Sequence, residues 1–188
     1  MMEHFLDPGY RGHAAAARLT GLLALRLANA DVPPLRYSAY AAEVKKELRS
    51  LQDEQAASPL VDLGPAFRQA AAWRAATLRL EERVARLLRS GKARTKGARA
   101  QFKRLAAVLR GQERALIQER GLPGRPWFKH QVYAPGRLTG YAAQPLPALA
   151  EAIEDGDAAV AVEYRELLVD SLARATREAK DGAGAAAR

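Results

Sequence analysis

The sequence has no cysteine, which excludes disulfide bonds, thiolate metal sites and cysteine nucleophiles. No apolar run approaches the ~18 residues that a membrane-spanning helix needs. The most apolar stretch, residues 19–30, is too short and is interrupted by Arg26. The first residues include neither a basic region nor a cleavage site, so we predict no signal peptide. None of these absences fixes the compartment of the protein, which stays unknown.

Residues that could carry catalysis are also scarce. His4, His13 and His130 are the only histidines, and none has a second histidine or a carboxylate at metal-ligand spacing. No serine lies in a GxSxG elbow, and no glycine-rich phosphate loop follows a strand. Lone histidines in a helical protein are usually structural or exposed. We therefore expect no catalytic residue, metal site or cofactor within this chain.

Patterns typical of α-helices cover most of the sequence. Asp7-Pro8 is a helix start, and residues 8–29 form a helix that is apolar on all sides, which is typical of a buried helix. Apolar residues at three-four spacing predict helices over 37–57, 65–90 and 98–119. A short helix over 147–155 and a last helix from 157 follow. The pattern predicts an all-α, four-helix-bundle-like domain.

Residues 121–147 form the one long break between the helices. This segment holds five of the ten prolines, which a helix interior does not accept, and four aromatic residues in a chain that is only 6% aromatic. A disordered linker would be polar and poor in aromatics. We therefore expect an ordered loop before the last helices, anchored to the bundle by Trp127, Phe128 and Tyr133. We expect His130 to hydrogen-bond the loop to a neighbouring backbone.

The sequence of this loop is similar to that of a known family. The run RPWFKHQVYAP, followed by GYAAQPLPAL, resembles the C-terminal helical domain of glutamate carboxypeptidase II and the transferrin receptor, and the resemblance extends over residues 2–180. The residues that match the family's loop motif in order are Arg125, Pro126, Phe128, His130, Tyr133, Ala134, Pro135, Tyr141, Ala142 and Pro147.

The resemblance implies a domain organisation and a role. Residues 1–34 would be a terminal helix belonging to the peptidase domain, residues 35–180 the helical dimerisation domain, and residues 181–188 a flexible tail. The family's zinc ligands and catalytic base lie in the peptidase domain, which we expect upstream of Met1. The chain would then be a non-catalytic fragment that forms a homodimer and contacts its parent's peptidase domain.

The resemblance also implies that the loop forms part of the wall of a substrate cavity. Glutamate-preferring members place a lysine directly before the tyrosine that matches Tyr141, and both residues hold the substrate's terminal carboxylate. Here the lysine position is Gly140, which puts glutamate specificity in doubt: the resemblance is compatible with a parent that prefers another C-terminal residue, or with one that is inactive as the transferrin receptor is. Arg137 is close enough in sequence to substitute for the lysine. The alternative for Tyr141 is a tyrosine that only packs within the loop.

A basic patch over residues 83–110 supports a different function. This patch supplies much of the formal net charge of +9, and it contains no acidic residue. It could be the solvated outer face of a helix, or it could bind polyanions by releasing their counterions. It lacks the interleaved aromatics of a nucleic-acid module, so we do not expect nucleic acid as a partner. A polyanion-binding helical module remains the alternative to a dimerisation domain.

Overall fold

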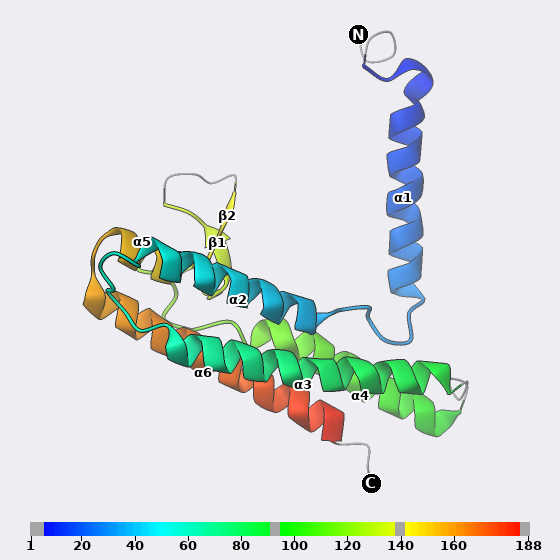
Figure 1. The fold of residues 1–188 in the computed structure, drawn as a ribbon. Helices are drawn as coiled ribbons and strands as arrows, with labels where there is room; N and C mark the ends of the chain where they lie inside the picture. Colours follow the sequence, from blue (N-terminus) through cyan, green and yellow to red (C-terminus); the bar gives the residue numbers. More distant parts are fainter. Residues whose placement is uncertain (1–5, 91–94, 138–141, 185–188) are drawn as a thin grey trace. The chain divides into compact units, whose positions relative to one another are not determined.

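The computed structural model describes residues 6–90, 95–137 and 142–184. The chain divides into two compact units, residues 1–34 and residues 35–188. The first unit contains the short 3-10 helix η2 (Pro8–Tyr10) and the helix α1 (Arg11–Ala28). The second unit contains all the other helices and strands that the structure describes (Figure 1).

Helix α1 begins three residues later than the sequence predicts. Gly9 and Tyr10 have positive φ angles of 66° and 54°, which ends the 3-10 turn before α1 begins. The carboxylate of Asp7 caps α1 by accepting hydrogen bonds from the backbone N–H groups of Gly12 and His13, at 2.8 and 2.9 Å. No residue of α1 is buried, and its five leucines are each 52–61% exposed. This exposure is unusual for a helix that is apolar on all sides.

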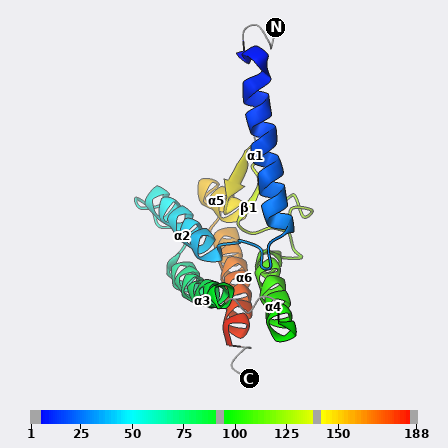
Figure 2. The ribbon, with the colours of Figure 1, turned by 90° about the vertical axis from the view of Figure 1, so that its right-hand side faces the viewer.

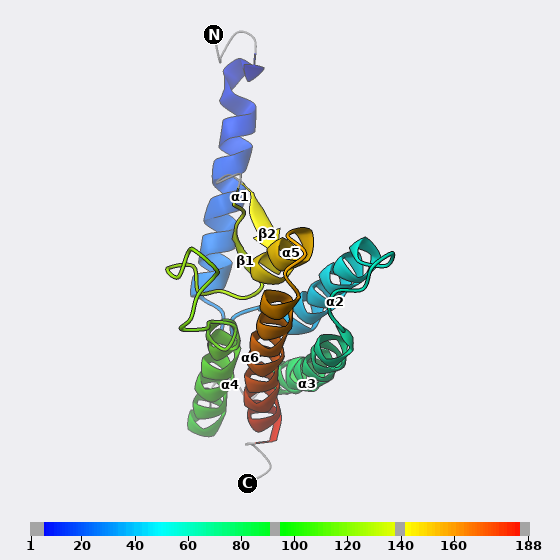
Figure 3. The same cartoon turned by 90° about the vertical axis from the view of Figure 1, so that its left-hand side faces the viewer.

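Four long helices build the second unit: α2 (Tyr37–Glu54), α3 (Gly64–Arg89), α4 (Lys96–Arg114) and α6 (Ala158–Gly184). Helix α6 packs against α3 and α4, and α2 packs against the other side of α3. Figures 2 and 3 accordingly show the helices in the order α4, α6, α3, α2. The short helix α5 (Pro147–Glu154) lies against the beginning of α6. The prediction of an all-α fold is confirmed.

The apolar residues that the sequence pattern placed on buried faces form the core. On α2 these are Tyr37, Ala41, Val44, Leu48 and Leu51. On α3 and α4 they include Trp73, Leu80, Phe102, Leu105 and Leu109. Burial of these side chains provides the main free energy that stabilises the unit.

The structure differs from the sequence prediction around the loop. Helix α4 ends at Arg114 instead of Glu119, because the chain after it pairs with the loop: Gln131 N–H donates to Leu116 O at 3.0 Å, and Gln118 N–H donates to Lys129 O at 2.9 Å. The loop also contains two short antiparallel strands, β1 (Tyr133–Pro135) and β2 (Ala143–Pro145), where the sequence indicated no strand. Three-residue strands are too short to give a period-two pattern.

The last helix is longer than predicted. Helix α6 continues through Gly184, into the segment predicted to be a flexible tail, and residues 185–188 lie outside the described chain. Gly182 is buried, and a Cβ atom at this position would lie 2.7 Å from Cγ1 of Val108. The absence of a side chain therefore lets α6 approach α4 closely at its end.

Candidate functional site

The proline-rich loop begins with a turn that requires glycine. Gly121 has a φ of +68°, and a Cβ atom there would lie 2.2 Å from the carbonyl oxygen of Pro126. The hydroxyl of Tyr164, on α6, donates a hydrogen bond of 2.9 Å to the carbonyl oxygen of Gly121. Tyr164 also belongs to the small apolar core beneath the loop, which contains Leu122, Ala134 and Ala148. The start of the loop is thus held against α6.

His130 holds the middle of the loop to α4. Its Nδ1 accepts hydrogen bonds from the backbone N–H groups of Val132 (3.2 Å) and Tyr133 (3.1 Å). Nε2 therefore carries the proton and donates to Oε1 of Glu113, on the last turn of α4, at 3.0 Å. This arrangement uses both ring nitrogens, but the backbone contacts are to the loop itself, and the contact that leaves the loop is to a side chain instead of the neighbouring backbone that the sequence analysis expected. Glu113 as the second partner could not be anticipated from the sequence.

Tyr133 connects the loop to α2. Its ring stacks on that of Tyr40, with centroids 5.9 Å apart and planes 13° from parallel. Tyr40 also contacts Trp73 of α3, whose indole N–H donates to the side chain of Gln112 on α4 at 2.8 Å. Burial, and then the charge of Glu113, raises the pKa of Tyr40, and burial raises that of Tyr133. Both phenols therefore remain neutral at physiological pH and act as packing groups.

A buried ion pair joins three parts of the loop region. The guanidinium of Arg125 donates to both carboxylate oxygens of Glu151, on α5, at 2.5 and 2.6 Å, and to the carbonyl oxygen of Pro135, on β1, at 2.7 Å. The side chains of Arg125 and Glu151 are only 15% and 6% exposed. Arg125 and Pro135 therefore have structural roles in the loop, and Glu151 is the partner that sequence spacing did not reveal.

Arg137 is engaged by carboxylates as well. Its Nη1 lies 2.6 Å from Oδ2 of Asp155 and its Nη2 lies 2.9 Å from Oδ1, with Glu154 and Glu151 within 3.9 Å. The hydrogen bonds to Asp155 raise the pKa of Arg137, and the same contacts lower the pKa of Asp155. Arg137 is thus neutralised by this chain's own acids. Gly140 and Tyr141 lie outside the described residues.

The predicted anchoring role of Trp127 is wrong for this domain. The side chain of Trp127 is 67% exposed and contacts the ring of its neighbour Phe128, at a centroid distance of 5.9 Å. Phe128 is instead partly buried and packs against the small core of Leu122 and Tyr164. Of these two consecutive aromatic rings, the first is exposed and the second packs against the helices. The composition of the loop could not indicate which one would pack.

The described residues offer no group of three or more histidine, aspartate or glutamate side chains that could hold a metal ion. His13 and His130 each contact a single carboxylate, and His4 lies outside the described residues. Within the part of the chain that the structure describes, no helix is long and apolar enough to cross a membrane.

The sequence matches the profile of the transferrin receptor-like dimerisation domain over residues 61–180, which include α3, α4, the loop, α5 and α6. The chain belongs to this family. Transferrin receptor-like dimerisation domains take their name from self-association, and the region is a non-catalytic domain of a family that includes peptidases.

Several curated proteins are similar to most of the chain. The chain is 32% identical over 154 residues to a probable glutamate carboxypeptidase LAMP1 of Arabidopsis thaliana, which covers 82% of the chain and 21% of the relative. It is 31% identical over 170 residues to a probable glutamate carboxypeptidase of Arthroderma benhamiae, with 88% and 22% covered. Aminopeptidase NAALADL1 of Mus musculus is 29% identical over 177 residues, with 89% and 23% covered. The chain spans about a fifth of the length of these relatives.

Proposed function

We propose that this domain forms a homodimer within a glutamate carboxypeptidase-like zinc peptidase, and that its loop, residues 121–147, faces the peptidase domain as a wall of the substrate cavity. The family's description supports self-association, and the names of its relatives support the peptidase context. The zinc ion and its ligands would belong to the peptidase domain. The helical domain would contribute dimer contacts and the positioning of the loop.

The exposure of Trp127 is the main observation that supports a contact between the loop and the peptidase domain. An indole that is 67% exposed is unusual on a segment whose neighbours are fixed by Arg125, His130 and Tyr133. Large aromatic side chains on rigid supports are typical centres of protein interfaces, because ordering them costs little further entropy. Ile117, 40% exposed, lies opposite His130 on the adjoining turn. We expect both apolar side chains to be covered by the peptidase domain.

The exposed leucines of α1 fit the same proposal. A helix with five leucines that are 52–61% exposed would bury a large apolar area on meeting a partner. In the parent protein, the peptidase domain would provide this partner. Isologous association of two copies would then use the helix faces of residues 35–184 that remain outside the core.

The loop's polar residues bear on substrate choice. We propose that Tyr141 donates a hydrogen bond to the terminal carboxylate of the substrate. No lysine precedes it, because the position is Gly140, and Arg137 is already paired with Asp155. The parent peptidase would therefore select glutamate less strongly than a member with the lysine. In the parent, Gly140→Lys should raise kcat/KM for a C-terminal glutamate over a C-terminal leucine by about tenfold, the effect of one added charge-assisted contact. An unchanged ratio would contradict a cavity-wall role.

Light scattering on the eluting protein, over a dilution series at low and high salt, tests the homodimer. We expect a mass twice the 20.4 kDa of the chain, and we expect it to persist at high salt because apolar contacts are not screened. The variant Leu22→Ser/Leu25→Ser is the control for pairing through α1, whose leucines are exposed. A dimer that survives in this variant supports association through the second unit. A monomer at every concentration would refute dimerisation by this domain alone.

A further inference from the structure

The end of the second unit that carries the turn between α3 and α4 has a concentration of unpaired positive charge. The sequence contains no aspartate or glutamate between residues 83 and 112. No ion pair among the described residues involves the basic side chains of this stretch. In contrast, Arg120, Arg125 and Arg137, in the loop region, each pair with a carboxylate. The described basic side chains at this end are Arg83, Arg86, Arg89, Arg99, Lys103 and Arg104.

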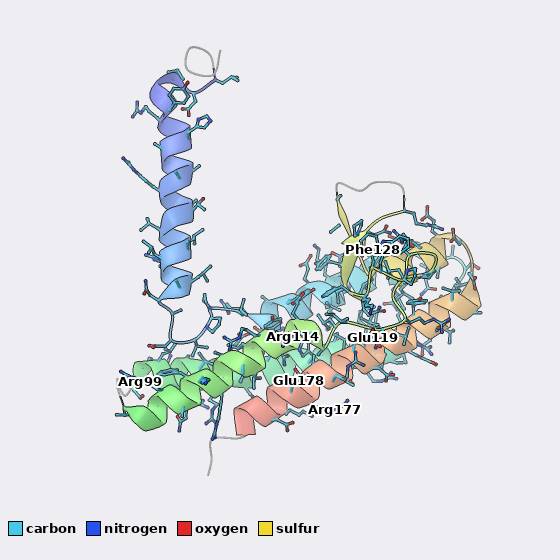
Figure 4. All side chains as sticks on the ribbon, turned by 180° about the vertical axis from the view of Figure 1, so that it is seen from behind. Arg99, Arg114, Glu119, Phe128, Arg177 and Glu178 are labelled. Atoms are coloured by element: carbon cyan, nitrogen blue, oxygen red, sulfur yellow. The ribbon has the colours of Figure 1, made fainter. Side chains whose placement is uncertain are left out.

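A pocket lies within this charged region. It has a volume of about 380 Å³ and is lined by Arg83, Arg86, Leu87, Ser90 and Gln101. The first four of these residues come from the last turns of α3 and its C-cap, and Gln101 comes from the second turn of α4. Figure 4 shows the neighbouring Arg99 at this end of α4, away from Arg114 and the loop. The pocket is therefore separate from the candidate site described above.

Arg83 gives the pocket a fixed cationic wall. Its Nη1 donates a hydrogen bond of 2.6 Å to the carbonyl oxygen of Ala183, near the end of α6, so the guanidinium is held in place. Its Nε is buried and has no hydrogen-bond partner among the described residues. A bound anion would therefore be held by the remaining terminal N–H groups of this fixed guanidinium. Arg86 is exposed and can close on a ligand without breaking an ion pair within the described chain.

We propose that this pocket binds a compact anion with clustered phosphate groups, either free in solution or as a lipid headgroup. Guanidinium groups form paired hydrogen bonds to phosphate oxygens, and the amide of Gln101 can add a further donor. Among the described residues, the lining contains one apolar side chain, Leu87, and no aromatic ring on which a nucleobase could stack. These features favour a small phosphorylated group over a nucleic-acid strand. The proposal does not depend on dimerisation or on a peptidase domain.

Calorimetric titration of the 188-residue chain with sodium tripolyphosphate at physiological salt tests the proposal. We expect saturable binding at one site per chain, weakened about tenfold by Arg86→Gln, which removes one charge-assisted contact from the pocket. Arg79→Gln is the matched control, because Arg79 is an exposed arginine of α3 that does not line the pocket. This control should weaken binding by less than about twofold, the effect of a distant charge that salt screens. Equal weakening by both variants, or no saturable binding, would overturn the proposal.

Vesicles distinguish the two sources of the phosphate. Flotation with phosphatidylcholine vesicles containing phosphatidylinositol bisphosphate, reversed by tripolyphosphate and lost in Arg86→Gln, would identify a lipid headgroup as the ligand. Tripolyphosphate binding without vesicle binding would identify a free anion. A third outcome would be tighter binding to duplex DNA than to tripolyphosphate, weakened equally by changes at Arg86 and Arg79. This outcome would indicate diffuse polyanion binding and would overturn the proposal of a specific anion site in this pocket.

Discussion

Breaking the buried ion pair between Arg125 and Glu151 should lower the free energy of unfolding of the domain, so that it unfolds at a much lower concentration of denaturant. Replacing Arg125 by Met leaves a carboxylate that is only 6% exposed, with Arg137 at 3.9 Å as its nearest other cation. Removing one partner of a buried pair typically costs ~3–5 kcal/mol, because the remaining charge is left uncompensated. For a domain of this size the loss corresponds to a fall in Tm of roughly 6–20 °C. The hydrogen bond from Arg125 to Pro135 O is lost as well.

Urea unfolding followed by circular dichroism measures the effect, with two comparison variants. The double variant Arg125→Met/Glu151→Leu removes both charges and should be more stable than Arg125→Met alone, since replacing a buried pair with apolar groups is often close to neutral. Arg120→Met breaks the exposed pair with Glu163, whose side chains are 64% and 35% exposed, and should cost less than ~1 kcal/mol. A loss below ~1 kcal/mol for Arg125→Met, or a double variant that loses more than it, would refute the reasoning.

Three substitutions and a change of pH test the rest of the loop and the tyrosines around it. Gly121→Ala should destabilise by at least ~2 kcal/mol in urea unfolding, since the positive φ and the close Pro126 oxygen both oppose a Cβ atom, and an unchanged midpoint would contradict this. Trp127→Ala should change stability by less than ~0.5 kcal/mol, whereas Phe128→Ala should cost about 2–3 kcal/mol; the reverse order would show that Trp127 is the anchor. Burial raises the pKa of Tyr40, Tyr133 and Tyr164, so unfolded tyrosines lose protons first as the pH passes 10. Stability should be fully present below pH 10 and fall above it, and absorbance at alkaline pH should show delayed ionisation in the folded state.

The sequence pattern was sufficient for the helices because their buried residues repeat at a local period. Leu48 and Val44 on α2, and Trp73 and Leu80 on α3, are all fully buried as their spacing indicated. The sequence pattern placed the end of α4 too far along the chain. Residues after Arg114 remain apolar at helical spacing, but their backbone groups pair with a segment of the loop more than ten residues away. Local propensity does not contain that competing contact.

For each contact that holds the loop, the sequence indicated one of the two residues and not its partner. Family resemblance selected Arg125, His130 and Tyr133, and each has a structural role. Their partners Glu151, Glu113 and Tyr40 are 26, 17 and 93 residues away in the chain. No pattern in the sequence indicated which carboxylate or ring would complete each contact, since side chains at such separations meet only through the tertiary fold.

The two units of the chain differ in how many apolar side chains they expose, so the proposed pairing of two copies and the proposed covering of α1 are different kinds of association. The second unit has a complete core, in which Trp73, Leu48, Leu80, Leu116 and Leu168 are at most 2% exposed. If two copies pair as proposed, they would therefore associate as folded domains through surfaces that also tolerate water. Helix α1 is different, because none of its residues is buried. An isolated helix of 18 residues is only marginally stable in water, so α1 depends on a partner surface for its own stability. The two proposed associations should therefore differ in what their loss changes. Dilution that separates two copies should leave the second unit folded, whereas α1, whose proposed cover belongs to the same parent chain, should lose helix where that cover is absent.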